Sequence, residues 1–175
     1  MTKKGWHHES ARHSLAARGV RTKESPHKHV IATKEHGKTT WDKMWQYLYL
    51  SPYYDDISKS ELAKEKSRIK RDYYRIKGVP PRVARAEMLK HPEVIDPNQT
   101  QNDSPEMFEM IEATWQYNGT LEGYVIPPES GRDDARVTFD GFTVPVNEYT
   151  AKRMRKDYHP DEFDKKPEGY RFWWD

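Results

Sequence analysis

The sequence predicts an α+β fold: a basic helical hairpin, then a helix and a three-stranded antiparallel meander with a C-terminal helix that covers the sheet. Apolar residues recur at helical spacing in the first ninety residues. Apolar and polar residues alternate on both sides of Asp140-Gly141, as they do in strands. A polar segment rich in proline and amides separates the two regions.

The residues around Asp140-Gly141 predict a β-hairpin with a two-residue turn. Asp-Gly between two apolar runs is a strong hairpin signal, because a type I′ turn needs positive φ at both central positions. In this hairpin the apolar side chains share one face, which we expect to lie on a core. They are Ala135, Val137, Phe139, Phe142, Val144 and Val146.

Thr120–Ile126 is the remaining strand, and we expect it to pair with 135–139. Pro145 has no N–H to donate, and in this hairpin its nitrogen points away from the partner strand. A further strand on that side is therefore not expected, and the meander has three strands in chain order.

Two helices accompany the meander. Ser104 is expected to cap a helix that begins at Pro105 and stops at Asn118-Gly119. Its buried side carries Met107, Ile111, Thr114 and Trp115. Asn147 is expected to cap a second helix, which runs to about Tyr158 and covers the apolar face of the sheet through Ala151 and Met154.

A capping box formed by Thr39 and Asp42 predicts a helix that runs to about Leu50. Four apolar residues follow the spacing i, i+3, i+4, i+7 of one buried helix face: Trp41, Met44, Trp45 and Leu48. This stripe is typical of a core rather than of a ligand site.

Ser58 and Glu61 form a second capping box, at the start of a long helix predicted over 59–77. Gly78 is expected as the residue just after its end. A short helix over 82–90 follows two prolines, so the two helices form a helical hairpin.

A helix, a glycine turn and a second helix on a basic background also allow a DNA-reading helix-turn-helix. Three positions argue against it. Tyr74 occupies the site that usually demands a small residue, Lys77 stands at the end of the first helix, and Glu87 falls where the second helix should face the core. A plain helical hairpin is the preferred interpretation.

The chain is expected to divide into a flexible basic arm over 1–38, a helical region over 39–90, a linker over 91–104 and an α+β region with an aromatic tail over 105–175. The arm contains nine lysines and arginines and six of the eight histidines, but few aliphatic residues. Low hydrophobicity with high charge predicts that it is disordered, or ordered only on a partner.

Charge is unevenly distributed along the chain. Residues 1–90 contain 21 Lys and Arg against 10 Asp and Glu, and residues 91–175 contain 9 against 18. Such asymmetry indicates a contact with nucleic acid or another polyanion in the first half. The alternative is that the basic half docks on the acidic half of its own or a neighbouring chain.

Composition excludes several classes of protein. The chain has no cysteine, so disulfides, thiolate metal sites and cysteine nucleophiles are excluded. No apolar run approaches the roughly 18 residues of a membrane span, and the first residues lack the apolar stretch of a signal peptide. These features favour a soluble cytoplasmic protein without a membrane partner.

Catalytic and cofactor motifs are also missing from the sequence. The pair His8-Glu9 is followed by Arg12 where a zinc protease has its second histidine. There is no Gly-x-Ser-x-Gly elbow and no glycine-rich phosphate loop. We therefore expect a protein that is not an enzyme and holds no metal or cofactor.

The N-terminal block Lys4-Gly5-Trp6-His7, followed by Arg12-His13-Ser14-Leu15-Ala16-Ala17-Arg18-Gly19, resembles the opening of assorted uncharacterised proteins from archaeal and phage-like genomes. The resemblance covers about a tenth of the chain and implies no activity.

The leading hypothesis is a nucleic-acid-associated accessory protein that binds the phosphate backbone of DNA or RNA without reading sequence. The residues predicted to make these contacts lie in the arm and in the basic helices: Lys3, Lys4, Arg12, Arg18, Arg21, Lys64, Arg68, Arg71, Arg75, Arg82 and Arg85.

The second hypothesis is a protein–protein adaptor or assembly subunit, of viral or mobile-element type, which self-associates or binds another protein. It uses the aromatic tail, in which Tyr170, Phe172, Trp173 and Trp174 are the candidate partner-binding residues. The alternative for the tail is an edge strand packed back on the sheet, with Tyr170, Phe172 and Trp174 on one side.

Overall fold

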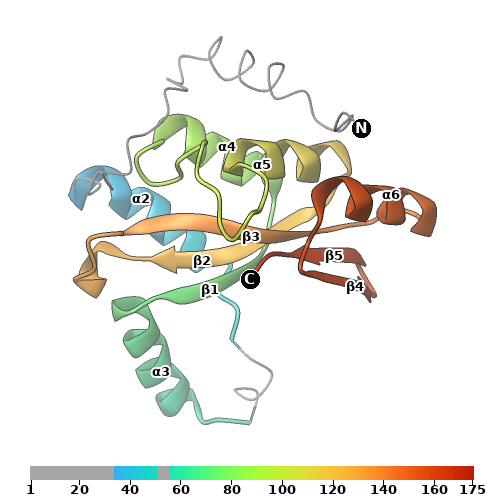
Figure 1. The fold of residues 1–175 in the computed structure, drawn as a ribbon. Coiled ribbons are helices and arrows are strands. Elements are labelled where there is room, and N and C mark those ends of the chain that lie inside the picture. Colours follow the sequence, from blue (N-terminus) through green and yellow to red (C-terminus); the bar gives the residue numbers. More distant parts are fainter. Residues whose placement is uncertain (1–33, 51–55) are drawn as a thin grey trace.

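The computed structural model describes residues 34–50 and 56–175, which contain a five-stranded antiparallel sheet of order β1-β2-β3-β5-β4 (Figure 1). The strands are β1 (Tyr74–Val79), β2 (Thr120–Ile126), β3 (Arg136–Val144), β4 (Glu162–Lys166) and β5 (Gly169–Trp173). The helices are α2 (Lys34–Trp45), α3 (Lys59–Arg71), α4 (Pro81–Lys90), α5 (Met107–Gln116), α6 (Glu148–Tyr158) and the short 3-10 helix η2 (Pro128–Ser130).

The α+β class is confirmed, but the predicted three-stranded meander is wrong because the sheet has five strands. The pairing of β2 with β3 is as predicted, with Val125 opposite Val137. Helix α6 also follows the prediction, since the Asn147 side chain accepts a hydrogen bond of 2.8 Å from the backbone N–H of Thr150. Helices α4, α5 and α6 lie on the same side of the sheet (Figure 1).

Asp140-Gly141 is not a turn. Strand β3 runs through both residues, and the register with β2 shifts so that Glu122 lies opposite Gly141 and Gly123 lies opposite Phe139. Asp140 is therefore the extra residue of a β-bulge. The bulge restores the apolar pattern to one face, because Val137, Phe139, Phe142 and Val144 are all buried.

The prediction that no strand lies beside Pro145 is wrong. Strand β5 pairs with β3 there, with Val144 opposite Tyr170 and Thr143 opposite Arg171. Pro145 follows the last residue of β3, so its missing N–H costs the ladder nothing. The tail thus forms an interior strand between β3 and β4 rather than an edge strand.

The predicted helix over 59–77 ends at Arg71, and Tyr74–Val79 form β1 at the sheet edge beside β2. A strand therefore separates α3 from α4, and both the helical hairpin and the helix-turn-helix are wrong. Gly78 lies in β1 with φ of 72°, where the register shifts between Ile76 and Val79. It is a bulge residue rather than a helix end.

Helix α2 begins before Thr39 and ends at Trp45, earlier than predicted. Residues 34–38 of the predicted arm belong to this helix, and residues 1–33 lie outside the described part of the chain. Leu48 instead forms a bridge with Ile76 of β1. Trp41 and Met44 are buried, as the apolar stripe predicts.

Glu87 of α4 does face the interior and is 1% exposed. Its carboxylate accepts a hydrogen bond of 2.9 Å from the Thr40 hydroxyl and pairs with the Lys43 ammonium. A buried charge is tolerated where its oxygens are hydrogen-bonded in this way. The pair and the hydroxyl join α4 to α2.

Helix α5 begins at Met107 rather than at Pro105, and its N-cap is Glu106 rather than Ser104. Trp115, predicted to be buried, is 44% exposed and lies beneath the Arg85 guanidinium. The predicted linker over 91–104 contributes Val94 and Ile95 to the core. No helix in the described ranges combines the length and apolar character needed to cross a membrane.

Candidate functional site

The sheet face opposite the core carries charged and aromatic side chains from four strands. We call it the polar face, and the residues that define it are Arg75 and Lys77 of β1, Glu122 and Tyr124 of β2, Arg171 and Trp173 of β5, and Glu162, Asp164 and Lys166 of β4. Side chains alternate along a strand, so core residues lie between members of this face, such as Ile76 between Arg75 and Lys77 and Phe172 between Arg171 and Trp173.

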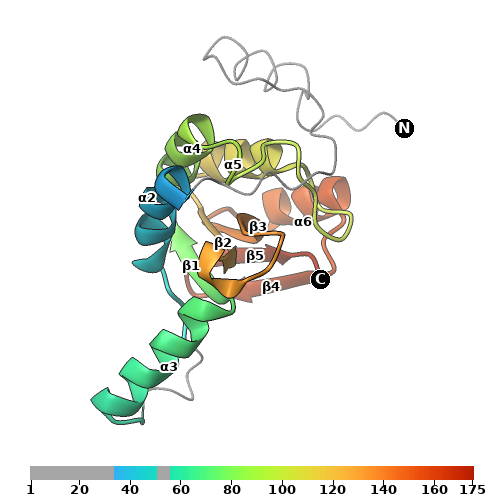
Figure 2. The same ribbon diagram turned by 90° about the vertical axis from the view of Figure 1, so that its left-hand side faces the viewer.

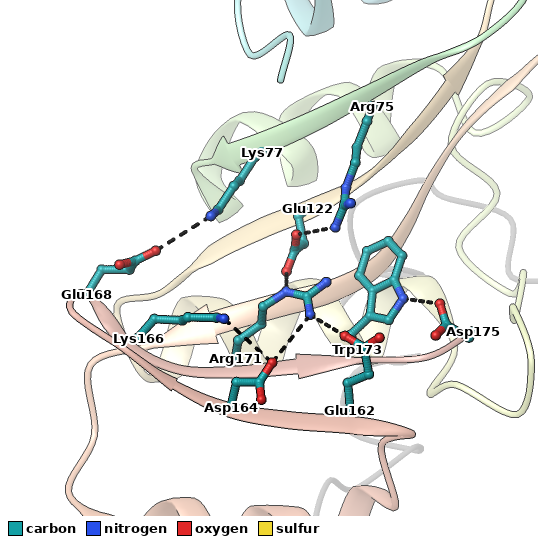
Figure 3. A network of polar contacts seen from close by, with 10 residues as sticks. All are labelled: Arg75, Lys77, Glu122, Glu162, Asp164, Lys166, Glu168, Arg171, Trp173 and Asp175. Atoms are coloured by element: carbon teal, nitrogen blue, oxygen red, sulfur yellow. Dashed lines mark hydrogen bonds and ion pairs between the residues drawn. The ribbon is translucent and has the colours of Figure 1, made fainter. Parts of the chain in front are cut away.

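Glu122 is the centre of an ion-pair network on this face (Figure 3). The residue is 2% exposed, and its carboxylate lies between the guanidinium of Arg75, at 3.2 Å, and that of Arg171. Arg171 also contacts Glu162 at 2.6 Å and Asp164 at 3.9 Å. The three carboxylates around Arg171 compensate its charge, which a buried ion requires.

Trp173 is held by both arginines of the network. The Arg75 guanidinium carbon lies 4.7 Å from the centre of the indole ring, and that of Arg171 lies 4.8 Å from it. Both distances are within the range of a cation–π interaction. The indole N–H donates a hydrogen bond to the Asp175 carboxylate, so the last residue is fixed beside the network (Figure 3).

A groove with a volume of about 290 Å³ opens on the polar face. Its walls are formed by Tyr49, Arg75, Lys77, Glu122, Tyr124, Glu162, Lys166, Arg171, Trp173 and Asp175. The wall at β1 includes Tyr49 because the segment beside β1 is hydrogen-bonded to it, with the Tyr49 N–H donating to the Arg75 carbonyl at 2.8 Å.

Three aromatic rings form a row that leads out of the groove. The Tyr124 ring lies 5.9 Å from that of Trp173 and 6.1 Å from that of Tyr73, both with edge-to-face geometry. Tyr73, just before β1, is 54% exposed. Burial raises the pKa of the Tyr124 hydroxyl, so this phenol is neutral at ordinary pH.

Asp140, the bulge residue, is a buried carboxylic acid next to the polar face. Burial raises its pKa to about 6, against the opposing effects of a 3.0 Å hydrogen bond from the Thr138 hydroxyl and of the charges on Arg136 and Arg75. Asp175 adds to the rise. The group therefore titrates just below neutral pH.

Helix α3 extends away from the sheet on the side of β1 (Figure 2). None of its thirteen residues is buried. It contains the six cations Lys59, Lys64, Lys66, Arg68, Lys70 and Arg71, and the two acids Glu61 and Glu65. The predicted capping box is present, with the Ser58 hydroxyl accepting from the Glu61 N–H at 3.3 Å and the Glu61 carboxylate accepting from the Ser58 N–H at 3.1 Å.

Three of the cations predicted to bind nucleic acid are paired within the chain. Arg68 contacts Glu65 at 2.5 Å and Asp72 at 3.6 Å, Arg75 contacts Glu122, and Arg85 contacts Glu112 at 2.9 Å. Lys64, Arg71 and Arg82 are exposed. Lys3, Lys4, Arg12, Arg18 and Arg21 lie outside the described residues.

The candidate partner-binding residues of the tail are buried. Tyr170, Phe172 and Trp174 face the core, where Phe172 stacks on Phe142 with ring centres 4.9 Å apart, and Trp173 lies in the ion-pair network. The exposed apolar surface on which the adaptor hypothesis depended is therefore absent from the tail.

The groove and its central residue Glu122 were not predicted from the sequence. Alternating polar residues at 75 and 77 were the available signal, but the helical spacing of their neighbours favours a helix there. Among the described residues no cluster of three or more histidines and carboxylates has the geometry to hold a metal ion. No protein-family model, curated protein or solved structure matches the chain.

Proposed function

We propose that this protein binds nucleic acid, with α3 as the element that contacts the phosphate backbone. The observation that supports the proposal most directly is a projecting helix that buries no residue and has six cations against two acids. Each phosphate contact releases condensed counterions, so such a surface gives affinity without a dedicated pocket and without reading sequence.

The local structure of α3 supports this role. An isolated helix of about thirteen residues is marginal in water, and most helices in proteins are stabilised by burying an apolar face. In this helix no residue is fully buried and Ile69 packs only partly against the core, so the capping box and the Arg68–Glu65 pair add support. Its lysines and arginines therefore stay at the surface, where a polyanion reaches them.

The N-terminal segment adds charge of the same sign. Residues 1–33 contain seven lysines and arginines against two glutamates. The proposal includes these cations as sequence-nonspecific contacts to DNA or RNA. The adaptor alternative has no comparable surface in the tail, because the tail packs on its own chain.

The test is fluorescence anisotropy with labelled single-stranded DNA and RNA between about 50 and 200 mM salt. The variant Lys64→Gln/Arg71→Gln removes two exposed cations of α3 and keeps good helix formers in their place. We expect weaker binding and a smaller slope of log K against log salt, with a decrease of about 0.7 for each phosphate that the variant no longer neutralises.

The matched control is Arg153→Gln/Lys156→Gln, which removes two exposed cations of α6, on the core side of the sheet. We expect this variant to bind like the wild type. Affinity that does not change with salt, or equal losses in both double variants, would contradict the proposal.

A further inference from the structure

The polar face begins close to the end of α3. Helix α3 ends at Arg71, Asp72 and Tyr73 follow, and strand β1 begins at Tyr74. Residues two apart on a strand point to the same face, so Arg75 and Lys77 share one side of β1, and Tyr73, just before the strand, contacts Tyr124 on that side. The cations of α3 are therefore continued by two further cations on the wall of the groove.

Arg75 is held in place and has donor capacity left. Its guanidinium lies between two rings, 4.7 Å from the centre of Trp173 and 5.5 Å from that of Tyr49. Of its five N–H donors, one contacts Glu122. The Nε is buried and has no hydrogen-bond partner among the described residues, so it is not open to the groove. The side chain as a whole is 34% exposed and lines the groove, so the donors that an anion would reach are those of the two terminal nitrogens.

Arg171 contrasts with Arg75, because three carboxylates surround it and its side chain is 10% exposed. Lys77 is more available, since its only described ion pair is with Glu168 at 3.7 Å, between two partly exposed side chains. Exposed pairs of this length contribute little energy, so a phosphate can displace the carboxylate. Arg75 and Lys77 are thus the pair that an anion would contact.

Tyr124 provides an aromatic surface beside these two cations. Its ring borders the groove and stands in the row that runs to the exposed Tyr73. Bases of single strands stack on such rings whatever their identity, whereas the bases of a duplex are already stacked on one another. The groove volume of about 290 Å³ is at the lower end of ligand pockets, which suits a small group rather than a duplex.

We propose that the groove accepts one unpaired nucleotide of a single-stranded nucleic acid, with its base against Tyr124 and its phosphate at Arg75 and Lys77. The inference rests on the proposed function and narrows its substrate class to single strands. It assigns α3 to the flanking phosphates and the groove to the base. If the ion-pair network served only to hold the strands together, the protein would bind a strand with bases and a strand without bases with equal affinity.

The test compares two labelled oligonucleotides of equal length and charge by anisotropy at low salt: oligothymidylate and an abasic strand with the same number of phosphates. We expect the wild type to bind oligothymidylate at least about fivefold more tightly, since stacking contributes at this level for each base. Tyr124→Leu should remove the preference and leave the affinity for the abasic strand unchanged. Tyr124→Phe keeps the ring and should keep the preference.

A competition measurement on the wild type tests the groove assignment without any variant, so it does not depend on whether Tyr124→Leu folds. Thymidine monophosphate and deoxyribose phosphate are used as competitors of labelled oligothymidylate. We expect the nucleotide to compete at concentrations at least about fivefold lower, because only it carries a base to stack. Equal competition would overturn the groove assignment.

The two proposals fail in different ways. Equal affinity for oligothymidylate and the abasic strand, with binding that still depends on salt and on Lys64 and Arg71, overturns the groove assignment and leaves the function of α3 standing. Salt-sensitive binding to neither strand overturns both.

Discussion

The backbone N–H of Trp174 donates a hydrogen bond of 2.9 Å to the carbonyl oxygen of Asp140. This bond joins the end of the chain to the middle of β3, at the residue that bulges. Gly141 next to it lies opposite Trp173 in the β3–β5 ladder. Asp140-Gly141 is therefore extended backbone between two neighbouring strands, and its position is fixed from both sides.

The bulge makes Gly123 of β2 intolerant of a side chain. A Cβ there would lie 2.0 Å from the Thr138 carbonyl oxygen and 2.7 Å from the Phe139 Cα, both backbone atoms that cannot rotate away. We expect Gly123→Ala to lower the free energy of unfolding by about 3 kcal/mol or more, at the upper end of overpacking effects. Urea unfolding followed by circular dichroism measures the loss.

Gly131→Ala is the control for this variant. Gly131 has φ of 73°, so alanine is strained there, but its Cβ meets nothing within 4 Å. We expect a cost of about 1 to 2 kcal/mol from the left-handed conformation alone. If both variants lose the same stability, the close approach of β2 and β3 is not the cause.

The sequence could not distinguish this bulge from a hairpin turn. A two-residue turn and a one-residue bulge both move the apolar alternation by one position, so Phe139 and Phe142 share a face in either case. The difference is made by a strand that is distant in the sequence, because β5 pairs with β3 at Gly141, within the predicted turn. The choice between the two depended on tertiary structure.

The strand β1 was missed for a related reason. Ile69, Tyr73 and Ile76 follow helical spacing, and a glycine ends the run. The same residues also fit alternation, since Tyr74 and Ile76 are buried while Arg75 and Lys77 point to the polar face. The spacing of apolar residues favoured a helix, but these residues form a strand because they pair with β2.

Asp140 predicts a dependence of stability on pH. Its pKa is about 6 in the folded protein and 3.8 for an ordinary aspartate, so the folded state holds a proton that the unfolded state releases between these values. Stability from this group is complete below about pH 4 and is lost as pH rises through 6. The difference amounts to about 3 kcal/mol.

Asp140→Asn removes this titration and keeps an oxygen that accepts from the Thr138 hydroxyl. We expect the variant to match the wild type near pH 4 and to be more stable above pH 6. Urea unfolding at several pH values measures the difference. Parallel stability profiles for the two proteins would contradict the assignment of the pKa to Asp140.

Glu122→Ala should be strongly destabilising. The substitution leaves the Arg75 guanidinium without its described carboxylate partner. It also removes one of the three carboxylates that surround Arg171. Both guanidinium groups lie against Trp173. Breaking a buried pair costs about 3 to 5 kcal/mol because the remaining charge stays buried. The midpoint of thermal unfolding measures the effect.

Glu148→Ala provides the comparison, since it breaks an ion pair with Lys152 on the exposed surface of α6. We expect its unfolding midpoint to stay close to that of the wild type. Equal effects of the two substitutions would show that the network around Glu122 is no more important than a surface pair.

Sequence patterns alone could not predict the ion-pair network around Glu122. Glu122 is 47 residues from Arg75 and 49 from Arg171, and nothing in the sequence between them predicts the contact. The alternation of β2 places Glu122 opposite the core, which is as far as the pattern goes. Its burial follows from the position of β5, which the three-stranded prediction lacked.

The tail provides the last prediction. Phe172 is fully buried, stacks on Phe142 and meets the edge of Phe163 of β4 with ring centres 5.1 Å apart. Phe172→Ala removes these contacts and leaves a cavity, so we expect a loss of about 3 to 5 kcal/mol in the free energy of unfolding. Urea unfolding measures it.

Deletion of residues 169–175 extends the test from one side chain to the strand. Without β5, β4 loses its only described partner strand and β3 loses its pairing at Val144, so we expect loss of cooperative unfolding. Tyr149→Ala, which truncates a side chain that is 77% exposed, should leave stability unchanged. A deletion that unfolds as cooperatively as the wild type would show instead that the tail is a detachable segment, and would restore the adaptor hypothesis.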